Sequence, residues 1–302
     1  MLPVFIQIIV LLLFPPLLLG IINKTKAFWA GRKGPSLFQP YYDIRKNLLK
    51  GFVFSTSTTW IFKAAPIVTV ISIGMAGLLL PTIIEKGVYS FSGDVFLFVY
   101  LFSLSRFFIT CSALDTASSF EGMGAAREVT FACFSELALF LILLIYAKLG
   151  NSLQLDQMLP DRGDSLLDKT NASLILVVFS LFVILLVENC RIPFDDPNTH
   201  LELTMIHEVI VLDHSGPLLG LIMYGAALRF YVLSSILVRT VFNMRFDVMA
   251  LNVAIFLAGI TLLSILVGTV ESIMARIKLI RIPGLIITSC VLAVFGLIFV
   301  MK

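Results

Sequence analysis

Ionisable side chains concentrate in one stretch of the sequence, residues 188–217, which lies between two long apolar runs. All three histidines of the chain lie in this stretch, together with several carboxylates. Its ionisable residues include Glu188, Arg191, Asp195, His200, Glu202, His207, Glu208, Asp213 and His214. Histidines that titrate near neutral pH beside carboxylates are suited to relaying protons or to docking another subunit. We therefore expect this stretch to carry the function.

The histidines also raise a second interpretation, a metal site. His200, His207 and His214 follow one another at intervals of seven residues, which is two turns, or about 10 Å, along an α-helix. Neighbouring histidines at that distance cannot share one ion. The four cysteines form no Cys-x-x-Cys pair, which argues against an iron–sulfur cluster or a zinc ribbon. We expect neither a metal nor a cofactor in this chain.

Two prolines interrupt the same stretch. Pro193 and Pro197 prevent a continuous helix, because proline lacks the backbone N–H that an interior helical position donates. We expect the chain to fold back at the membrane surface and then to form a short helix over residues 199–212.

Glu136 is the clearest candidate for proton transfer within an apolar run, with Arg127 and Glu128 about two helical turns before it. Ionisable groups inside a membrane are costly and mark functional sites. Burial favours the neutral form of a carboxyl and a nearby guanidinium favours the charged form, so the two effects together suit a group that takes up and releases protons. The alternatives are a purely structural ion pair and a carboxyl that is simply neutral.

Three further charges lie within or at the ends of apolar runs. Arg106 and Arg229 lie inside theirs, and we expect both to extend toward a membrane interface. Glu271 precedes Arg276 by five residues, a spacing that permits a pair on one helix face. The same position places a carboxylate at the level of residues 188–217.

The composition requires a membrane protein. Of 302 residues, 59% are hydrophobic and 14% are charged, whereas charged residues make up about a quarter of soluble domains. The apolar runs are too long for barrel strands, so we expect an all-α, polytopic fold with about eight transmembrane helices of roughly 20 residues each. The first run lacks a basic n-region, which favours a span over a signal peptide. The expected spans are residues 2–22, 61–84, 95–114, 129–149, 173–187, 218–241, 249–270 and 283–301, in a single membrane domain over residues 1–302.

Basic residues predict the orientation. Thirteen of the 22 Lys and Arg residues lie in the odd-numbered connections, and seven lie on the other side. Since Lys and Arg favour the cytoplasmic side, we expect the long first loop and the loop between helices 5 and 6 to be cytoplasmic and both termini to lie outside. Residues 41–54 mix basic and apolar side chains, which suggests an interfacial helix; a tether without a partner is the alternative. A net charge of +3 spread over short loops argues against nucleic acid as a partner.

Several of these motifs, in this order, resemble the membrane subunit that anchors the hydrophilic arm of respiratory complex I, the complex I subunit 1 family, and its relatives in membrane-bound group 4 nickel–iron hydrogenases and formate hydrogenlyase. The resemblance covers nearly the whole chain. Its markers are Arg32-Lys33-Gly34-Pro35, Gln39-Pro40 with Asp43 and Lys46, Ala126-Arg127 with Glu136, Glu188 to Asp195 with Glu202-Leu203, and Ser215-Gly216.

Departures from the complex I pattern favour the hydrogenase branch. Ile22 stands where complex I members have a glutamate, and Ser135 stands where they have a tyrosine. Of their Glu-x-Glu-x-Glu run, Glu202 alone remains. These differences argue against a quinone chamber. Residues 271–276 match instead the hydrogenase-type Glu-Ser-x-x-Ala-Arg.

The resemblance implies two sets of functional residues. The proton-path or coupling set is Glu136, Arg127, Glu128, Glu188, Glu202, Glu208, Asp213, His200, His207 and Glu271. The docking set is Arg32, Gly34, Pro35, Gln39, Asp43, Lys46, Arg191, Pro193, Phe194 and Asp195.

The resemblance also implies partners and a place in the cell. It implies a membrane-anchor subunit, not catalytic alone, that docks a hydrophilic redox module and couples its electron transfer to proton or sodium translocation. Iron–sulfur clusters and a nickel–iron centre would belong to partner subunits, a large and a small one, and antiporter-like subunits would complete the membrane arm. The expected location is a prokaryotic cytoplasmic (inner) membrane. The alternatives are a quinone-site subunit of NADH:quinone oxidoreductase and a stand-alone ion transporter.

Overall fold

A computed structural model describes residues 2–82, 87–158, 169–195, 206–242 and 248–301. Within these residues the chain forms helices and no strands, which confirms the expected all-α fold. The helices are α1 (Leu2–Leu13), α2 (Pro15–Trp29), α3 (Gln39–Leu48), α4 (Trp60–Leu79), α5 (Asp94–Asp115), α6 (Ser119–Gly150), α7 (Leu155–Met158), α8 (Lys169–Glu188), α9 (His207–Ile210), α10 (Gly216–Val241), α11 (Met249–Ile273), the 3-10 helix η1 (Leu279–Arg281) and α12 (Ile282–Met301).

The described residues contain fewer membrane-length helices than the eight spans expected. Six helices, α4, α5, α6, α10, α11 and η1–α12, are long and apolar enough to cross a membrane. The bent pair α1–α2 makes seven if it counts as one span, and α8 contributes a shorter apolar helix, Ser173–Glu188. A polytopic helical membrane protein is therefore confirmed, while the count of eight and the sides of the loops stay predictions.

A bend of 48° separates α1 from α2 within the first expected span. Pro15 and Pro16 occupy the first positions of α2, where the missing N–H of proline costs nothing because those donors have no intrahelical partner. The same prolines cannot continue α1 without losing hydrogen bonds. The first apolar run is therefore two helices, and the second extends to Trp29.

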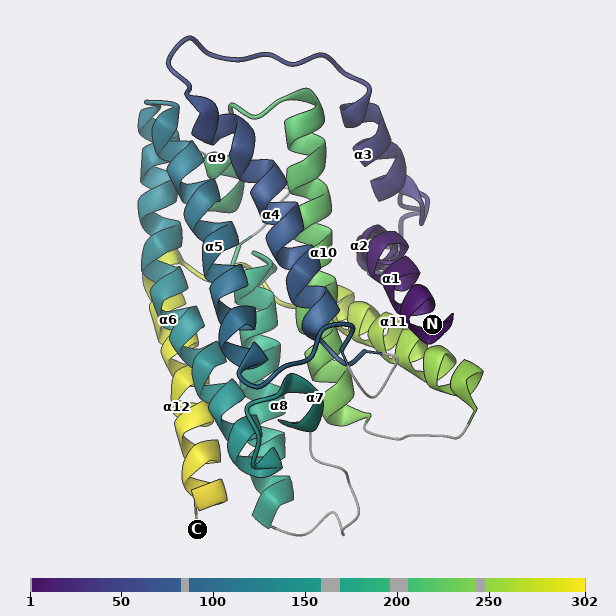
Figure 1. Ribbon diagram of the computed structural model, residues 1–302. Coiled ribbons are helices and arrows are strands. Elements are labelled where there is room, and N and C mark those ends of the chain that lie inside the picture. The colour runs from purple at the N-terminus through teal and green to yellow at the C-terminus, as the bar shows by residue number, and fades with distance from the viewer. Residues whose placement is uncertain (1, 83–86, 159–168, 196–205, 243–247, 302) are drawn as a thin grey trace.

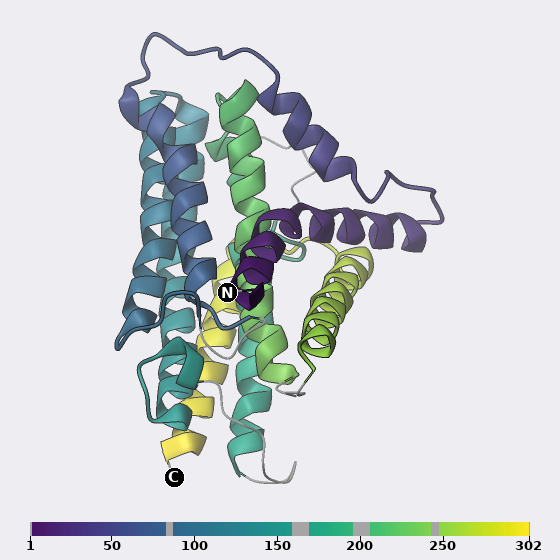
Figure 2. The same ribbon diagram turned by 45° about the vertical axis from the view of Figure 1, so that its right-hand side comes forward.

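α10 is the central helix of the bundle. In the most apolar stretch of α10, 78% of the residues are buried. In the corresponding stretch of η1–α12, at the edge of the bundle, 22% are buried. α4 packs against α5 and α10, α12 packs against α8 and α6, and α2 packs against α11. Figure 1 shows α9 near the beginnings of α4, α6 and α10 at one end of the bundle, and the C-terminus at the other end. Figure 2 shows α2 crossing the direction of the bundle helices above α11.

Three boundaries differ from the expected ones. α6 begins at Ser119, so Arg127 and Glu128 lie within a helix and not in a connection. α3 ends at Leu48, and the chain is not helical from there to residue 59, which shortens the expected interfacial helix. Of the helix expected over residues 199–212, α9 is the described part; residues 199–205 lie outside the described residues.

Gly268 tests the packing of α11 against α2. A Cβ at this position would lie 2.8 Å from Thr25 Cβ and 3.1 Å from the Ile22 carbonyl oxygen. Gly268→Ala is expected to separate the two helices and to lower stability by about 1–3 kcal/mol, measured as a lower melting temperature in nanodiscs. Gly74→Ala is the matched control, because a Cβ at Gly74 meets no atom within 4 Å. Equal melting temperatures for the two variants would contradict this packing.

Candidate functional site

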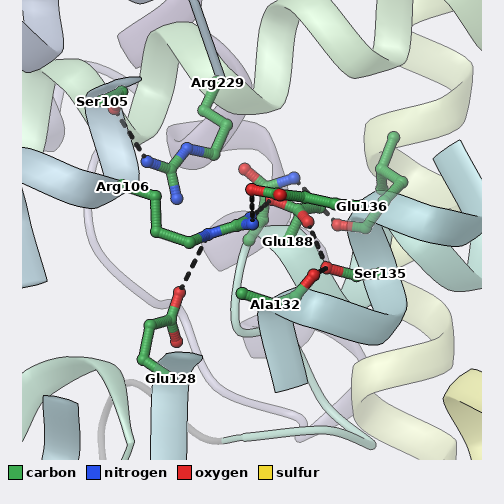
Figure 3. Close-up of polar contacts among 10 residues, drawn as sticks. Ser105, Arg106, Glu128, Ala132, Ser135, Glu136, Glu188 and Arg229 are labelled. Atoms are coloured by element: carbon green, nitrogen blue, oxygen red, sulfur yellow. Dashed lines mark hydrogen bonds and ion pairs between the residues drawn. The ribbon is translucent and has the colours of Figure 1, made fainter. Parts of the chain in front are cut away.

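A buried arginine on α5 gathers carboxylates from two other helices. Arg106 is 8% exposed, and its guanidinium donates hydrogen bonds to Glu136 on α6 and Glu188 at the end of α8. Its Nε lies 3.7 Å from Oε1 of Glu128, also on α6. We call these four residues the Arg106 cluster (Figure 3).

The local sequence explains why the carboxylates converge. Glu128 and Glu136 are eight residues apart on α6, so they lie on one side of that helix about two turns apart. Glu188 is the last residue of α8, and its Oε1 accepts a hydrogen bond of 2.6 Å from Ser135 Oγ. The serine at position 135 thus fixes the third carboxylate beside the other two.

A second guanidinium lies beside the cluster. Arg229 on α10 is also 8% exposed and donates a 3.1 Å hydrogen bond to Ser105 Oγ, and Figure 3 shows it next to Arg106. With all groups ionised, two guanidiniums face three carboxylates, so the group becomes neutral when one carboxyl takes up a proton. Interacting carboxyls of this kind share their protons. The arrangement suits the uptake and release of one proton.

The expectation that Arg106 and Arg229 extend to an interface is wrong. Both lie in helix interiors and are buried, because carboxylates of other helices compensate their charge. The position of Arg106 well inside its apolar run was the available signal, since an unpaired charge there is too costly. Which carboxylates it meets depends on tertiary packing that the sequence does not display.

A second set of ion pairs holds the chain after α8. Glu271 on α11, with its side chain fully buried, forms an ion pair with Lys26 Nζ on α2 at 2.8 Å and lies 3.4 Å from Arg191 Nη1. Asp195 pairs with Arg276 at 2.7 Å. We call these five residues the Glu271 clasp. Because α11 ends at Ile273, Arg276 does not share a helix face with Glu271, and that expected arrangement is wrong.

Three residues of the expected docking set are buried in or beside the Glu271 clasp. Pro193, Phe194 and Asp195 are buried, and the ring of Phe194 packs edge-on against that of Phe131. Asp195 Oδ2 also accepts from the backbone N–H of Ile206 at 3.1 Å. These side chains pack within the loop, and a docking role for them stays a prediction; Arg191 is half-buried.

The other docking candidates lie at or near the surface. Gln39 and Asp43 on α3 are joined by a 2.8 Å hydrogen bond. Arg32, Gly34, Pro35 and Lys46 are exposed.

A cavity of about 460 Å³ lies between the Arg106 cluster and α9. Arg106, Glu128, Glu188, Arg191, Glu208 and His207 are among its polar lining residues. Leu19, Ile222 and Met223 are among its apolar ones. The cavity thus brings members of the coupling set together with side chains of α2 and α10.

The two described histidines are neutral at physiological pH. Burial, with the charges of Arg229 and Arg191, lowers the pKa of His207 to about 4, although Asp195 opposes this effect. Burial also lowers the pKa of His214 to about 4; its ring stacks on Phe62 with centroids 4.0 Å apart. The expectation of histidines that titrate near neutral pH is therefore wrong for both.

The remaining candidates are dispersed. The backbone N–H of Asp213 donates a 3.0 Å hydrogen bond to Glu121 Oε1. Arg127 is half-buried, and its guanidinium lies 3.2 Å from Met123 Sδ. His200 and Glu202 lie outside the described residues. Among the residues that the structure describes, no three His, Cys, Asp or Glu side chains gather in a way that could hold a metal ion.

The fold and the buried charges define a class of protein, a polytopic helical membrane subunit with an ionisable centre. The whole chain has the fold of a chain in the membrane-bound sulfane sulfur reductase, an archaeal respiratory membrane complex, with a TM-score of 0.82, 18% identity, and coverage of 99% of this chain and 98% of that one.

The sequence comparisons identify the family. Residues 2–301 match the family model described as NADH dehydrogenase, and the chain belongs to that family. It is 32% identical to hydrogenase-4 component C of Escherichia coli K12 over 234 residues, 77% of this chain and 72% of that protein. It is 30% identical to formate hydrogenlyase subunit 4 of the same organism over 224 residues, 74% of this chain and 72% of that protein. The resemblance inferred from the motifs is confirmed.

Removal of Arg106 tests the cluster. Arg106→Leu leaves three carboxylates without their shared partner and is expected to cost about 3–5 kcal/mol of unfolding free energy, measured by denaturant unfolding in detergent. Arg106→Leu combined with Glu188→Leu is expected to cost less than the sum of the two single changes, because the pair is coupled. Additive losses, or an Arg106→Leu chain as stable as the exposed control Lys46→Leu, would contradict the cluster.

The pKa of His207 predicts a pH dependence. Between about 6.5 and 4 an unfolded histidine binds a proton and folded His207 does not, so the unfolded state gains protons and stability falls as the pH falls through this window. His207→Gln is expected to lose less stability than the native chain between pH 7 and pH 4, measured as melting temperature against pH. Both chains contain the same carboxylates, so the pH dependence that these carboxylates cause cancels when the two melting-temperature profiles are subtracted. Identical pH profiles would refute the assignment.

Proposed function

We propose that this chain is the membrane-anchor subunit of a complex of the hydrogenase or formate hydrogenlyase type. It docks a hydrophilic redox module and couples electron transfer in that module to the movement of protons or sodium ions. The observation that carries the proposal is the Arg106 cluster, a buried group of charges that can hold one exchangeable proton beside a cavity. The names of the two relatives, a hydrogenase component and a formate hydrogenlyase subunit, support the type of complex.

The partners that we propose are those that the resemblance implies. A nickel–iron-type large subunit and an iron–sulfur small subunit form the redox module and carry its metal centres, and antiporter-like subunits continue the membrane arm. We propose eight spans, with α1–α2 as the first and α8 as the fifth, in a prokaryotic cytoplasmic membrane. The odd-numbered loops face the cytoplasm and receive the module, and the exposed residues Gly34, Pro35 and Lys46, with Gln39 and Asp43 on α3, contribute to docking.

The proposed coupling extends from the loops that dock the redox module to the lateral face of the bundle around Glu136. The segment after Glu188 is held by the Glu271 clasp, so a displacement of that segment acts on Glu188 directly. Glu188 shares the guanidinium of Arg106 with Glu136. The side chain of Glu136 is 34% exposed, beside exposed Phe134 and Leu137. We propose that this face contacts the next membrane subunit and passes it the proton or the change of charge.

The cavity supports a second candidate, a subunit that lines a quinone site. Its volume of about 460 Å³ and its partly apolar wall fit a planar apolar molecule with polar ends. Quinone-dependent turnover of the complex, or its inhibition by quinone analogues, would favour this candidate over the hydrogenase type. Ion transport by the purified chain without partners would favour the third interpretation, a stand-alone transporter.

Neutralising Glu136 tests the coupling. Glu136→Gln keeps the size of the side chain and its contact with Arg106 but removes the exchangeable proton, so the complex is expected to assemble and turn over without moving ions. The measurement is ion uptake per electron transferred in proteoliposomes. Asp115→Asn is the control, because Asp115 lies at the end of α5 and accepts hydrogen bonds from Thr59. Full ion uptake by the Glu136→Gln complex would refute the role.

A further inference from the structure

The end of α2 exposes large aromatic side chains. Phe28 is 78% exposed and Trp29 is 54% exposed, and their rings pack edge-on with centroids 6.3 Å apart. Figure 2 shows this end of α2 extending away from the bundle. Two large rings at the tip of a helix need an apolar environment that the rest of the described chain does not provide there.

Exposed basic residues surround these rings. Lys24, Arg32 and Lys33 are exposed, and Lys24 Nζ donates a 2.7 Å hydrogen bond to the carbonyl of Lys33, which brings the two lysines together. The sequence contains no Asp or Glu from residue 1 to residue 42. The positive charge of this end of α2 is therefore not neutralised by acidic residues nearby in the chain. We call Lys24, Phe28, Trp29, Arg32 and Lys33 the α2 tip.

The level of the α2 tip relative to the bilayer follows from the helix that carries it. α1 and α2 together are apolar and long enough for one broken span or a re-entrant loop. In the eight-span arrangement proposed above they form the first span, which places the C-terminal end of α2 near the boundary of the hydrocarbon region. Tryptophan rings are enriched at this boundary. Lysine and arginine beside it attract the phosphate groups of anionic lipids. The rings thus fit the outer acyl region of a lipid leaflet, and the charges fit the phosphate groups of the same leaflet.

We propose that the α2 tip binds anionic phospholipids, with Phe28 and Trp29 in the acyl boundary and Lys24, Arg32 and Lys33 on the phosphate groups. A soluble redox module is a poorer occupant, because Phe28 and Trp29 would then pack against protein at a point where the adjoining span meets lipid. The inference assigns Arg32 to lipid and leaves Gln39, Asp43 and Lys46 on α3 for docking. It does not depend on the redox partner or on coupling.

The two tryptophans of the chain allow a direct test. In a Trp60→Phe chain, Trp29 is the sole tryptophan. The full chain is placed in nanodiscs of phosphatidylcholine with a minor fraction of phosphatidylglycerol, and either lipid is brominated at equal mole fraction so that it quenches fluorescence on contact. Brominated phosphatidylglycerol is expected to quench Trp29 at least about twofold more strongly at low salt, and added salt is expected to reduce the difference.

Charge variants complete the test. Arg32→Gln with Lys33→Gln is expected to abolish the preference for phosphatidylglycerol. Lys46→Gln with Lys50→Gln removes the same charge at other exposed positions and is expected to retain it. Equal quenching by the two lipids, absence of quenching, or a preference that survives Arg32→Gln with Lys33→Gln would overturn the proposal.

A second measurement uses the assembled complex in its membrane. A photoreactive amino acid at position 29 is expected to give lipid adducts. Cross-links to a partner subunit would show that protein covers the α2 tip and would overturn the proposal. Because neither assay requires turnover, a failed coupling experiment and a failed lipid experiment are distinguishable.

Discussion

The bundle depends on the compensation of one buried guanidinium. Arg106 lies within an apolar helix, where an unpaired charge costs several kcal/mol. Glu128 and Glu136 of α6 and Glu188 of α8 supply the compensation, so α5, α6 and α8 have to meet at one level. Glu188 is the last residue of α8. The ionisable segment after α8 therefore begins at the level of the Arg106 cluster.

The Glu271 clasp extends the constraint to the other side of the molecule. Glu271 joins α2 to the segment after α8, and Asp195 joins that segment to Arg276 after α11. One short segment therefore connects the Arg106 cluster with α2 and α11. A partner that displaces this segment would change both sets of ion pairs. The same contacts that stabilise the fold thus provide a physical route for coupling.

Much of the fold and part of the site could be predicted from the sequence. Apolar runs predict the helices, and Glu136 and Glu188 stand out as carboxylates within or at the end of such runs. The burial of Phe194 could not be predicted from composition, because it depends on packing between distant segments. The bend before α2 has a local cause in Pro15 and Pro16, which the prediction of one continuous first span did not use. The low pKa of His207 depends first on burial and then on the charge of Arg229, 22 residues away in the sequence. Residue types indicate which groups can carry charge, but tertiary contacts decide which of them do.

In the proposed coupling, the carboxyls of the Arg106 cluster exchange a proton when the attached redox module changes its oxidation state. Redox-induced infrared difference spectroscopy of the assembled complex measures this directly, because protonated and ionised carboxyls absorb at different frequencies. A carboxyl difference band is expected between the oxidised and the reduced complex, and this band is expected to be lost in a Glu188→Gln complex. A spectrum without a carboxyl change, or one that is identical in the Glu188→Gln complex, would contradict it.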